Sequence, residues 1–530
     1  MSLTDELCRS YLDLRWHFDP AAASQVGLTV YDGRLGHYDA ASVEEHLAAF
    51  RALEAAVEEL DFGGAGDEVD RTALLDDVRG TIFRLQYESP HRHDPTFWAL
   101  HLCQALATVD RHLEDDLSGP EIALARLRGV PSFVEDAQAT IRLSDAQSPL
   151  IDACIQLVGA AESLVGDLRD RLGFIAGENP EEVSELTLDA LSSWRASLTS
   201  DLSEDAGAEA GPGVVGVGTE QFDRLLHHLH AIRAGSAELW RYLLHLEEDT
   251  EEELASLAAT DDPSRPWLDQ IQDDEVASQP PSALIAEAEA ELYELTTFLR
   301  DHDLFPAVEL PEVGALPRYL EVVQGLPEYR PGIGPGGRGG GGARIELGSW
   351  AATRRWLSPM MAELGIPGLH QHEAVAAGLE AEVRRQLESR LTRGGWGLYA
   401  VRLMDELGYW PTTRGRLLAR SYSLLRILLA QIDVGIHKHQ LTVEGGVAKL
   451  QDRFDLDTTH AQALVIGCLL QPTEAVGAIV GQRELFRLRD DFRLQEGGGP
   501  GFSLAEFHKR VLSFGGLPVP LVRWGMDFDD

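Results

Sequence analysis

Positive charge is scarce in this sequence, and lysine is scarcer still. The 530 residues include 45 Lys and Arg against 87 Asp and Glu, which gives a formal net charge of −42. Lysine occurs only at Lys438, Lys449 and Lys509. Nucleic acids and anionic membranes bind through basic surfaces, so this balance argues against both as main partners. We attribute the shortage of lysine first to GC-rich coding bias and second to adaptation to salt.

Cysteine and long apolar runs are also scarce. Cys8, Cys103, Cys154 and Cys468 lie far apart and form no Cys-x-x-Cys pair, so neither a zinc ribbon nor a disulfide framework is indicated. The chain has no uncharged apolar run of about 18 residues, so we expect no membrane-spanning helix. Residues 1–7 lack a basic segment leading into an apolar one, so we expect no signal peptide. Together these absences predict a cytoplasmic protein.

Several common catalytic motifs are missing. The glycine-rich segment 330–343 does not end in Gly-Lys-Ser or Gly-Lys-Thr, so we expect a flexible surface loop and not a phosphate-binding loop. No Gly-x-Ser-x-Gly occurs, which argues against an α/β-hydrolase serine. No Gly-x-Gly-x-x-Gly follows a strand pattern, which argues against a dinucleotide site.

What the sequence does contain is helical periodicity. In residues 43–60, apolar side chains recur three and four positions apart, as they do on one face of a helix. The same pattern returns in residues 122–143, 151–172, 222–246, 282–298, 373–391, 416–436 and 459–470. Gly129 and Pro131 are expected to interrupt the first of these. Alternating patterns are rare, so the sequence predicts a mainly α fold with few or no strands.

Residues 205–218 are rich in glycine, alanine and acidic side chains, which is typical of a linker. A chain of 530 residues is also long for one small domain. We therefore expect an N-terminal helical half, 1–210, and a C-terminal helical half, 211–530, within one intertwined body.

The densest polar chemistry lies in the C-terminal half. His370, His372 and Glu373 stand close together just before a long predicted helix. Imidazole and carboxylate groups are ligands that Zn²⁺ accepts. Residues 372–376, however, read His-Glu-Ala-Val-Ala and lack the second histidine of the His-Glu-x-x-His zinc motif. This cluster could therefore be a metal site, or it could be a polar helix cap at the wall of a channel.

A second pair, Asp433 and His437, is spaced four residues apart, so on a helix the two side chains share one face. An aspartate can orient an imidazole, or it can hydrogen-bond to a histidine that ligates a metal. A hydrogen bond within the helix is the alternative.

Several segments, in the same order, resemble a widespread bacterial family known only as domain of unknown function 885. The matching segments are Asp19-Pro-Ala-Ala-Ala-Ser-Gln-Val-Gly27, Tyr31-Asp-Gly-Arg-Leu35, Val217-Gly-Thr-Glu-Gln-Phe222, Gly395-Trp-Gly-Leu-Tyr-Ala400, Asp405-Glu-Leu-Gly408, Asp433-Val-Gly-Ile-His437, Phe502-Ser-Leu-Ala-Glu-Phe-His508 and Gly516-Leu-Pro518. The family is similar to helical metallopeptidases. The resemblance therefore implies a large helical metallopeptidase-like body with a deep central channel.

The resemblance also implies a metal signature, HExxPGHHxQ followed by EGWxLYAE, whose histidines bind zinc and whose first glutamate activates water. Aligned on Pro367-Gly368, the signature positions hold Glu363, Leu364, Leu369, His370, Gly394 and Val401. Only His370 remains of the expected metal ligands. A leucine cannot act as a base and a glycine cannot ligate, so the family's peptidase chemistry is not expected in this chain.

The first hypothesis is a pseudoenzyme without a cofactor. Its helical channel would bind a small peptide or amino-acid-derived ligand, with Trp396, Tyr399, Arg426 and His437 as contact residues. For the two aromatic residues, packing in the core is an equal alternative.

The second hypothesis is a metal-dependent hydrolase or lyase with a rebuilt site, acting on a similar small substrate. Glu363, Glu373 and Asp433 would then be catalytic, and His370 and His372 would hold zinc. A third hypothesis is an assembly protein that interacts through its acidic surface, although acidic charge alone is usually a solvated face.

Overall fold

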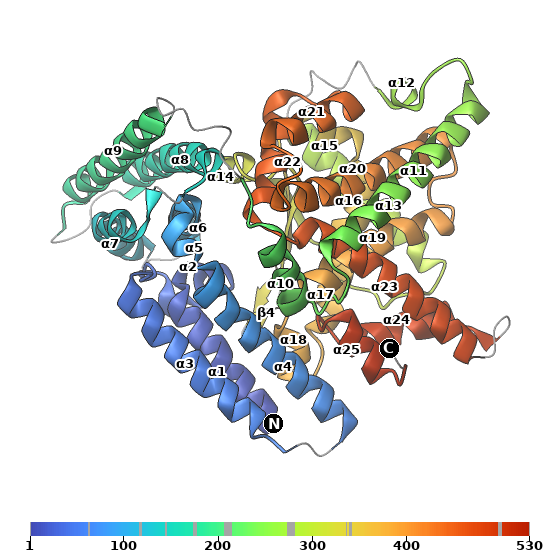
Figure 1. Cartoon of the computed structure of the whole chain (residues 1–530), viewed down its shortest axis with the longest axis horizontal. Helices are drawn as coiled ribbons and strands as arrows, with labels where there is room; N and C mark the ends of the chain where they lie inside the picture. The colour runs from blue at the N-terminus through green and yellow to red at the C-terminus, as the bar shows by residue number, and fades with distance from the viewer. Residues whose placement is uncertain are drawn as a thin grey trace. The chain divides into compact units, whose positions relative to one another are not determined.

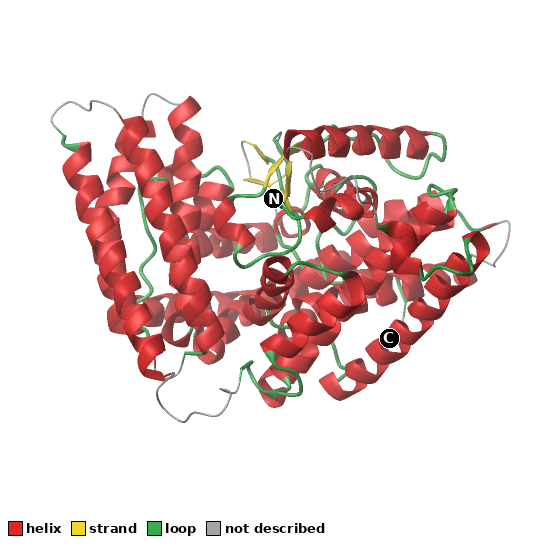
Figure 2. Ribbon diagram, turned by 90° about the horizontal axis from the view of Figure 1, so that it is seen from above, coloured by secondary structure: helices red, strands yellow, loops and turns green. Residues whose placement is uncertain are grey.

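The computed structural model describes residues 2–61, 64–115, 119–143, 146–172, 178–205, 215–272, 281–334, 337–338, 342–496 and 501–528. Helices dominate, and the few strands are short (Figures 1 and 2). The predicted mainly α fold is therefore confirmed.

The chain forms two compact units. The N-terminal unit comprises residues 1–61, 77–214 and 318–322, and the C-terminal unit comprises residues 62–76, 215–317 and 323–530. The division into domains 1–210 and 211–530 stays a prediction. The compact units differ from it mainly in two segments, because 62–76 belongs to the C-terminal unit and 318–322 to the N-terminal unit. Most of the predicted linker, 206–214, lies outside the described residues.

In its described residues, the N-terminal unit contains helices and no strands. The helices are α1 (Leu3–Phe18), α2 (Pro20–Gln25), the 3-10 helix η1 (Thr29–Tyr31), α3 (Ala40–Glu58), the π-helical turn η2 (Arg84–Glu88), α5 (Pro90–His93), α6 (Pro95–Asp115), α7 (Gly119–Thr140), α8 (Ser148–Leu172), α9 (Pro180–Asp205) and α14 (Arg318–Glu321). Helix α4 (Ala65–Phe83) begins in the C-terminal unit and ends in the N-terminal one.

Helix α3 shows how the sequence produces these elements. Asp39 precedes the helix, and its carboxylate accepts hydrogen bonds from the backbone N–H groups of Ala41 and Ser42. Such a cap satisfies N–H groups that have no partner within the helix. The predicted apolar positions, among them Leu47 and Phe50, form its buried face.

Helix α7 differs from the expectation, because it runs without a break through Gly129 and Pro131. A proline inside a helix leaves the carbonyl oxygen four residues earlier without its N–H donor. Here that carbonyl belongs to Leu127, and the Thr187 hydroxyl donates a hydrogen bond to it at 2.9 Å. A side chain of α9 therefore supplies the missing donor.

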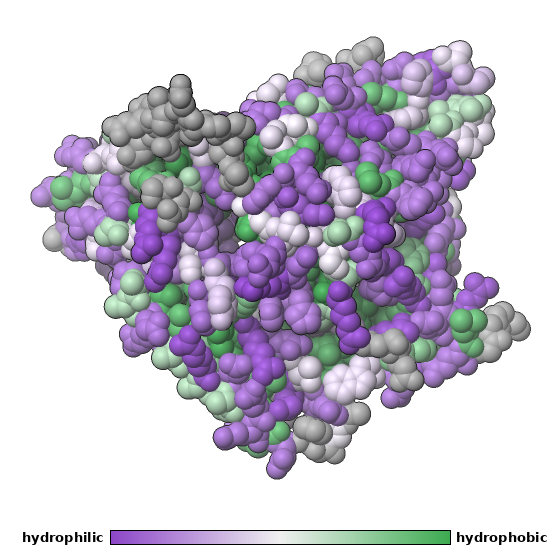
Figure 3. Space-filling view, viewed as in Figure 1, coloured by the Kyte–Doolittle hydropathy of each residue, from purple (hydrophilic) through white to green (hydrophobic). Residues whose placement is uncertain are grey.

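Helix α8 is long and apolar enough to cross a membrane, by length and composition alone. Helices α22 and α23 of the C-terminal unit, described below, pass the same test only as a pair bent by 79°. In the structure α8 lies against α6 and α9, and its apolar residues Leu157, Val158 and Val165 are buried. Core packing accounts for its composition. Figure 3 shows a face of the molecule covered largely by hydrophilic residues.

The C-terminal unit combines many helices with a small sheet. Its helices are α10 (Thr219–His230), α11 (Ser236–Asp261), α12 (Trp267–Ile271), α13 (Pro281–Arg300), α15 (Ala351–Arg355), α16 (Leu357–Leu364), α17 (Leu369–Ala376), α18 (Glu382–Gln386), α19 (Arg390–Glu406), α20 (Thr413–His437), α21 (Val443–Phe454), α22 (Thr458–Leu470), α23 (Glu474–Gln495), α24 (Leu504–Leu512) and α25 (Val519–Gly525). Its strands are β1 (Glu312–Ala315), β2 (Glu328–Arg330), β3 (Ile333–Gly334), β4 (Gly337–Arg338) and β5 (Arg344–Leu347).

Strand β5 lies between β1, to which it is parallel, and β2, to which it is antiparallel. Strands β3 and β4 pair with each other, with Ile333 opposite Arg338. The glycine-rich segment expected to be a plain surface loop therefore contains a short two-stranded ladder. Residues 335–336 and 339–341 of that segment lie outside the described residues.

Helices α19 and α23 cross at very short range in the C-terminal unit. A Cβ atom on Gly395 would lie 2.4 Å from the backbone carbon of Gly481. Only glycine permits such an approach of two backbones. This crossing places the predicted Gly395–Ala400 segment deep in the core.

Candidate functional site

The predicted site residues all lie in the C-terminal unit, on α16, α17, α19 and α20. All of them except Arg426 are at most 8% exposed. The segment 359–373 is buried at every position. The site must therefore be judged by the partners that these buried polar groups have.

Glu363 is the acidic residue at the first signature position. Its Oε2 accepts a hydrogen bond from the Tyr422 hydroxyl at 2.5 Å, and its Oε1 lies 3.2 Å from Nη2 of Arg426. Burial lowers the pKa of Arg426, but the nearby Glu363 charge more than offsets this and leaves the pKa above its ordinary value. Both oxygens of the carboxylate are therefore engaged within the core, and a role as general base would require one of these contacts to break.

His370 uses both of its ring nitrogens inside the protein. Nε2 lies 2.5 Å from the carbonyl oxygen of Glu309, and Nδ1 lies 3.1 Å from the Tyr329 hydroxyl. A carbonyl can only accept, so Nε2 carries the proton and Nδ1 accepts from Tyr329. Burial lowers the pKa of His370. The imidazole is thus a neutral structural bridge.

His372 and Glu373 follow on the same helix, α17. Nε2 of His372 lies 3.0 Å from the carbonyl oxygen of Gly515, to which it donates a hydrogen bond. Its ring lies 5.7 Å from that of Trp396. Glu373 is also buried. Among the described residues, no three His, Cys, Asp or Glu side chains are grouped in a way that could hold a metal ion.

The remaining signature positions do not fit the zinc site that the resemblance implies. A Cβ atom on Gly394 would lie 2.7 Å from Cβ of Ala478 on α23, so a ligating side chain has no room there. Leu364 and Leu369 are buried apolar residues. A catalytic zinc needs about three protein ligands. At the aligned positions only Glu363 and His370 carry side chains that could ligate zinc. Glu363 contacts Arg426 and Tyr422, and both nitrogens of His370 are engaged.

Trp396 and Tyr399, predicted to contact a ligand, lie in an aromatic cluster. Trp396 donates from Nε1 to the carbonyl oxygen of Pro367 at 2.9 Å. The Tyr399 hydroxyl is hydrogen-bonded to Nε2 of His508 at 2.8 Å, and the His508 ring stacks on Phe305 at 4.5 Å. Burial lowers the pKa of His508 to about 3. His508 belongs to the matching segment 502–508, but no role was predicted for it.

Asp433 caps another helix. Its two carboxylate oxygens accept hydrogen bonds from the backbone N–H groups of Thr473 and Val476, at 3.0 and 3.1 Å, where α23 begins. Burial raises the pKa of Asp433 to about 8, helped by the nearby negative charge of Glu474 and opposed by the N–H donors. Its Oδ1 lies 3.8 Å from Nε2 of His437, so the predicted pair faces each other but each member has nearer partners.

His437 connects two distant segments. Its Nδ1 accepts a hydrogen bond from the backbone N–H of Val217 at 3.2 Å, and its Nε2 donates to the carbonyl oxygen of Cys468 at 3.1 Å. The ring also stacks on Phe222. Burial lowers its pKa to about 4. Two of the matching segments, 217–222 and 433–437, therefore touch each other.

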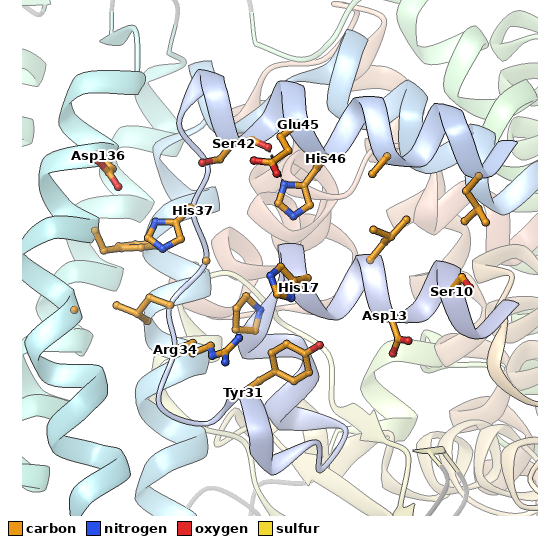
Figure 4. Close-up of a pocket in the computed structure, with 18 of the residues that line it drawn as sticks. Ser10, Asp13, His17, Tyr31, Arg34, His37, Ser42, Glu45, His46 and Asp136 are labelled. Atoms are coloured by element: carbon orange, nitrogen blue, oxygen red, sulfur yellow. Dashed lines mark hydrogen bonds between the residues drawn. The ribbon is translucent and has the colours of Figure 1, made fainter. Parts of the chain in front are cut away.

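A cavity of about 1110 Å³ lies in the N-terminal unit, where the sequence analysis placed no site. Figure 4 shows polar side chains from α1, α3, α7 and the segment 31–37 around it. Its polar lining consists of Ser10, Asp13, His17, Tyr31, Arg34, His37, Ser42, Glu45, His46, Ser132 and Asp136. These residues are scattered over the sequence, which hides the site. The one available signal was that segment 31–35 matches the family.

A buried arginine supports the wall of this cavity. Arg126 is fully buried, and its Nη2 contacts the hydroxyl of Ser24 and the carbonyl oxygen of Tyr31, the latter at 3.4 Å. Burial lowers its pKa to about 10, opposed by the charges of Asp32 and Asp19. The matching segments 19–27 and 31–35 thus converge on one guanidinium, which fixes their conformation.

Comparison with known proteins agrees with the fold. The structure matches a predicted lipoprotein of unknown function from Shewanella oneidensis, with a TM-score of 0.80, 17% identity, and coverage of 99% of this chain and 100% of that one. It also matches a predicted lipoprotein from Colwellia psychrerythraea, with a TM-score of 0.80, 14% identity and 99% coverage of both chains. These likenesses concern the fold alone.

No curated protein matches the sequence. A family model described as "Bacterial protein of unknown function (DUF885)" matches residues 20–526, nearly the whole chain. The resemblance found in the sequence is thereby confirmed, and the chain belongs to the DUF885 family.

Proposed function

We propose that this protein is a binding protein that lacks metal-dependent peptidase activity and takes a small peptide or amino-acid-derived ligand. The observation that carries the proposal is the ion pair between Glu363 and Arg426 in the core of the C-terminal unit. A water-activating carboxylate must have an oxygen free to accept a proton, whereas both oxygens of Glu363 already have partners, Arg426 and Tyr422. The acidic residue next to the position of the signature's catalytic glutamate is thus engaged in internal contacts.

The histidines support the same proposal. A zinc ion binds the lone pair of a neutral imidazole nitrogen, and the free lone pair of His370 already accepts a hydrogen bond from Tyr329. Binding zinc there would require Tyr329 to move. The two ring nitrogens of His437 are likewise hydrogen-bonded to backbone groups of Val217 and Cys468. Each group would have to give up internal hydrogen bonds before it could ligate.

The proposal extends to location and partners. The net charge of −42 disfavours nucleic acid and anionic membranes as partners. All four cysteines are free and buried, which fits a reducing compartment such as the cytoplasm. The lipoprotein label belongs to the two structural neighbours.

The direct test is turnover of a peptide library by the full chain, with and without added zinc. We expect no turnover above the background of a heat-inactivated sample. Metal-dependent cleavage that His370→Ala abolishes would instead establish the rebuilt hydrolase. Because His370→Ala also removes packing, Tyr329→Phe serves as the matched variant. It removes only the hydroxyl that occupies Nδ1, and so should raise any activity that depends on zinc binding there.

A further inference from the structure

We infer that the cavity of the N-terminal unit is the binding site for a zwitterionic short peptide, held by its carboxylate at Arg34 and by its ammonium group at Glu45. This inference rests on the proposed binding function and specifies where the ligand binds. The cavity lies entirely within one compact unit, between α1, α3, α7 and the segment 31–37.

Arg34 is the cation of the site. Its guanidinium lies 5.7 Å from the centre of the Tyr31 ring, and it forms no ion pair with any residue that the structure describes. By contrast, Arg79 of the same unit pairs with both Glu54 and Glu58. Stacking on an aromatic ring orients a guanidinium without neutralising it. Arg34 therefore presents an exposed positive charge that no described carboxylate pairs with, and such a charge suits the carboxylate of a ligand.

The anions of the site lie on other elements. Glu45 is on α3, Asp13 on α1 and Asp136 on α7, and within the described part of the chain none of the three has a cationic partner. In Figure 4, Glu45 lies across the cavity from Arg34 and Tyr31. Opposite charges on two sides of a cavity match a molecule with an ammonium group at one end and a carboxylate at the other.

Two imidazoles lie between these charged groups. Figure 4 shows His17 and His46 in the middle of the cavity, and their rings are 6.5 Å apart. Nδ1 of His46 lies 2.7 Å from the carbonyl oxygen of Ser42, to which it donates. In the neutral ring this leaves Nε2 as an acceptor. An acceptor in this position suits the peptide N–H groups of a ligand.

The floor of the cavity has room for an apolar side chain. Ala49, Ala52, Leu53 and Ala56 line it from one face of α3, together with Leu14 of α1. Small side chains at this spacing leave a trough along the helix. The volume of about 1110 Å³ slightly exceeds the roughly 300–1,000 Å³ of typical small-molecule sites. The site is therefore larger than a single amino acid requires.

Isothermal titration calorimetry with L-alanyl-L-leucine tests the site, because each end of this dipeptide can be blocked separately. We expect the free dipeptide to bind, and its C-terminal amide and N-acetyl forms each to bind about tenfold more weakly or worse, since each loses a charge-assisted contact. Arg34→Ala should weaken the free dipeptide by a similar factor and leave the amide unchanged. Glu45→Gln should likewise weaken binding of the free dipeptide and leave binding of the N-acetyl form unchanged.

Arg195→Ala is the matched control, because Arg195 lies on α9 of the same unit, pairs with Glu162 and does not line the cavity. Arg34 and Glu45 are exposed, so their variants should keep the circular dichroism of the parent. Absence of dipeptide binding would overturn the inference. Binding that is indifferent to both substitutions would place the ligand elsewhere while preserving the proposed function. Metal-dependent cleavage of the dipeptide would instead overturn the proposed function.

Discussion

Glu363 and Arg426 form an ion pair at 3.2 Å in the core of the C-terminal unit, at a position where the family signature has a metal ligand. The Tyr422 hydroxyl donates a hydrogen bond to the same carboxylate. An acidic group that is neutralised and held in this way is part of the folded core. This ion pair leads to predictions about stability as well as about function.

Removing one member of the ion pair should cost more than removing both. Arg426→Leu leaves the Glu363 carboxylate buried without its cation, which costs about 3–5 kcal/mol. The double variant Glu363→Leu, Arg426→Leu should recover part of this loss. Urea unfolding of the three proteins measures the difference. Arg195→Leu, which breaks an exposed pair with Glu162, should change stability by less than about 1 kcal/mol. A comparably small loss in Arg426→Leu would show that the pair does not matter.

His437 predicts a loss of stability in acid. The folded protein keeps this imidazole neutral down to about pH 4, whereas the unfolded chain takes up a proton near its ordinary pKa of 6.5. The free energy of unfolding should therefore fall as the pH decreases from about 6.5 to about 4. His437→Asn should be less stable at neutral pH but should lose less stability in acid. Parallel pH profiles for the two proteins would contradict the assigned environment.

Asp433 predicts the opposite slope. Its pKa is raised from 3.8 to about 8, so the folded protein holds a proton that the unfolded chain has released, and stability should fall as the pH rises from about 4 to about 8. Asp433→Asn keeps an acceptor for the start of α23 and should flatten this slope. Asp433→Ala removes both acceptors and should cost roughly 1–2 kcal/mol at pH 5. Thermal melts across this pH range distinguish the three proteins.

Restoring the missing glutamate of the signature should damage the fold. A side chain at Gly394 meets Ala478 at 2.7 Å, so Gly394→Glu should push α19 and α23 apart and cost about 1–3 kcal/mol or more. Gly159→Ala on α8 is the matched control. Its Cβ would meet nothing within 4 Å, and it should be neutral or slightly stabilising. A Gly394→Glu protein of undiminished melting temperature that binds zinc would show that the site can be rebuilt.

The helices could be predicted because their signal is local. The apolar positions of residues 43–60 repeat with the helical period, and the structure places α3 at Ala40–Glu58. The prediction was wrong at Pro131, because the donor that rescues the helix, Thr187, comes from a different segment. Propensity rules cannot include such a distant partner.

The sequence could predict which residues belong to the candidate site, but it could not predict their hydrogen-bond partners. The sequence located His370 and His437, but their partners Glu309, Tyr329, Val217 and Cys468 lie far away in the chain. Hydrogen bonds to backbone atoms leave no trace in the side-chain pattern. The cavity around Arg34 could not be predicted either, because its walls come from four separate stretches of the sequence.

The most direct test of the central claim is a zinc titration of protein purified without chelator, followed by mass spectrometry for bound metal and by thermal melting. The account predicts less than one zinc per chain at any concentration that does not precipitate the protein, and no change in melting temperature. His370→Ala and the parent should then retain the same trace of metal. One zinc per chain, with a raised melting temperature that His370→Ala abolishes, would contradict the account and restore a metal-dependent enzyme.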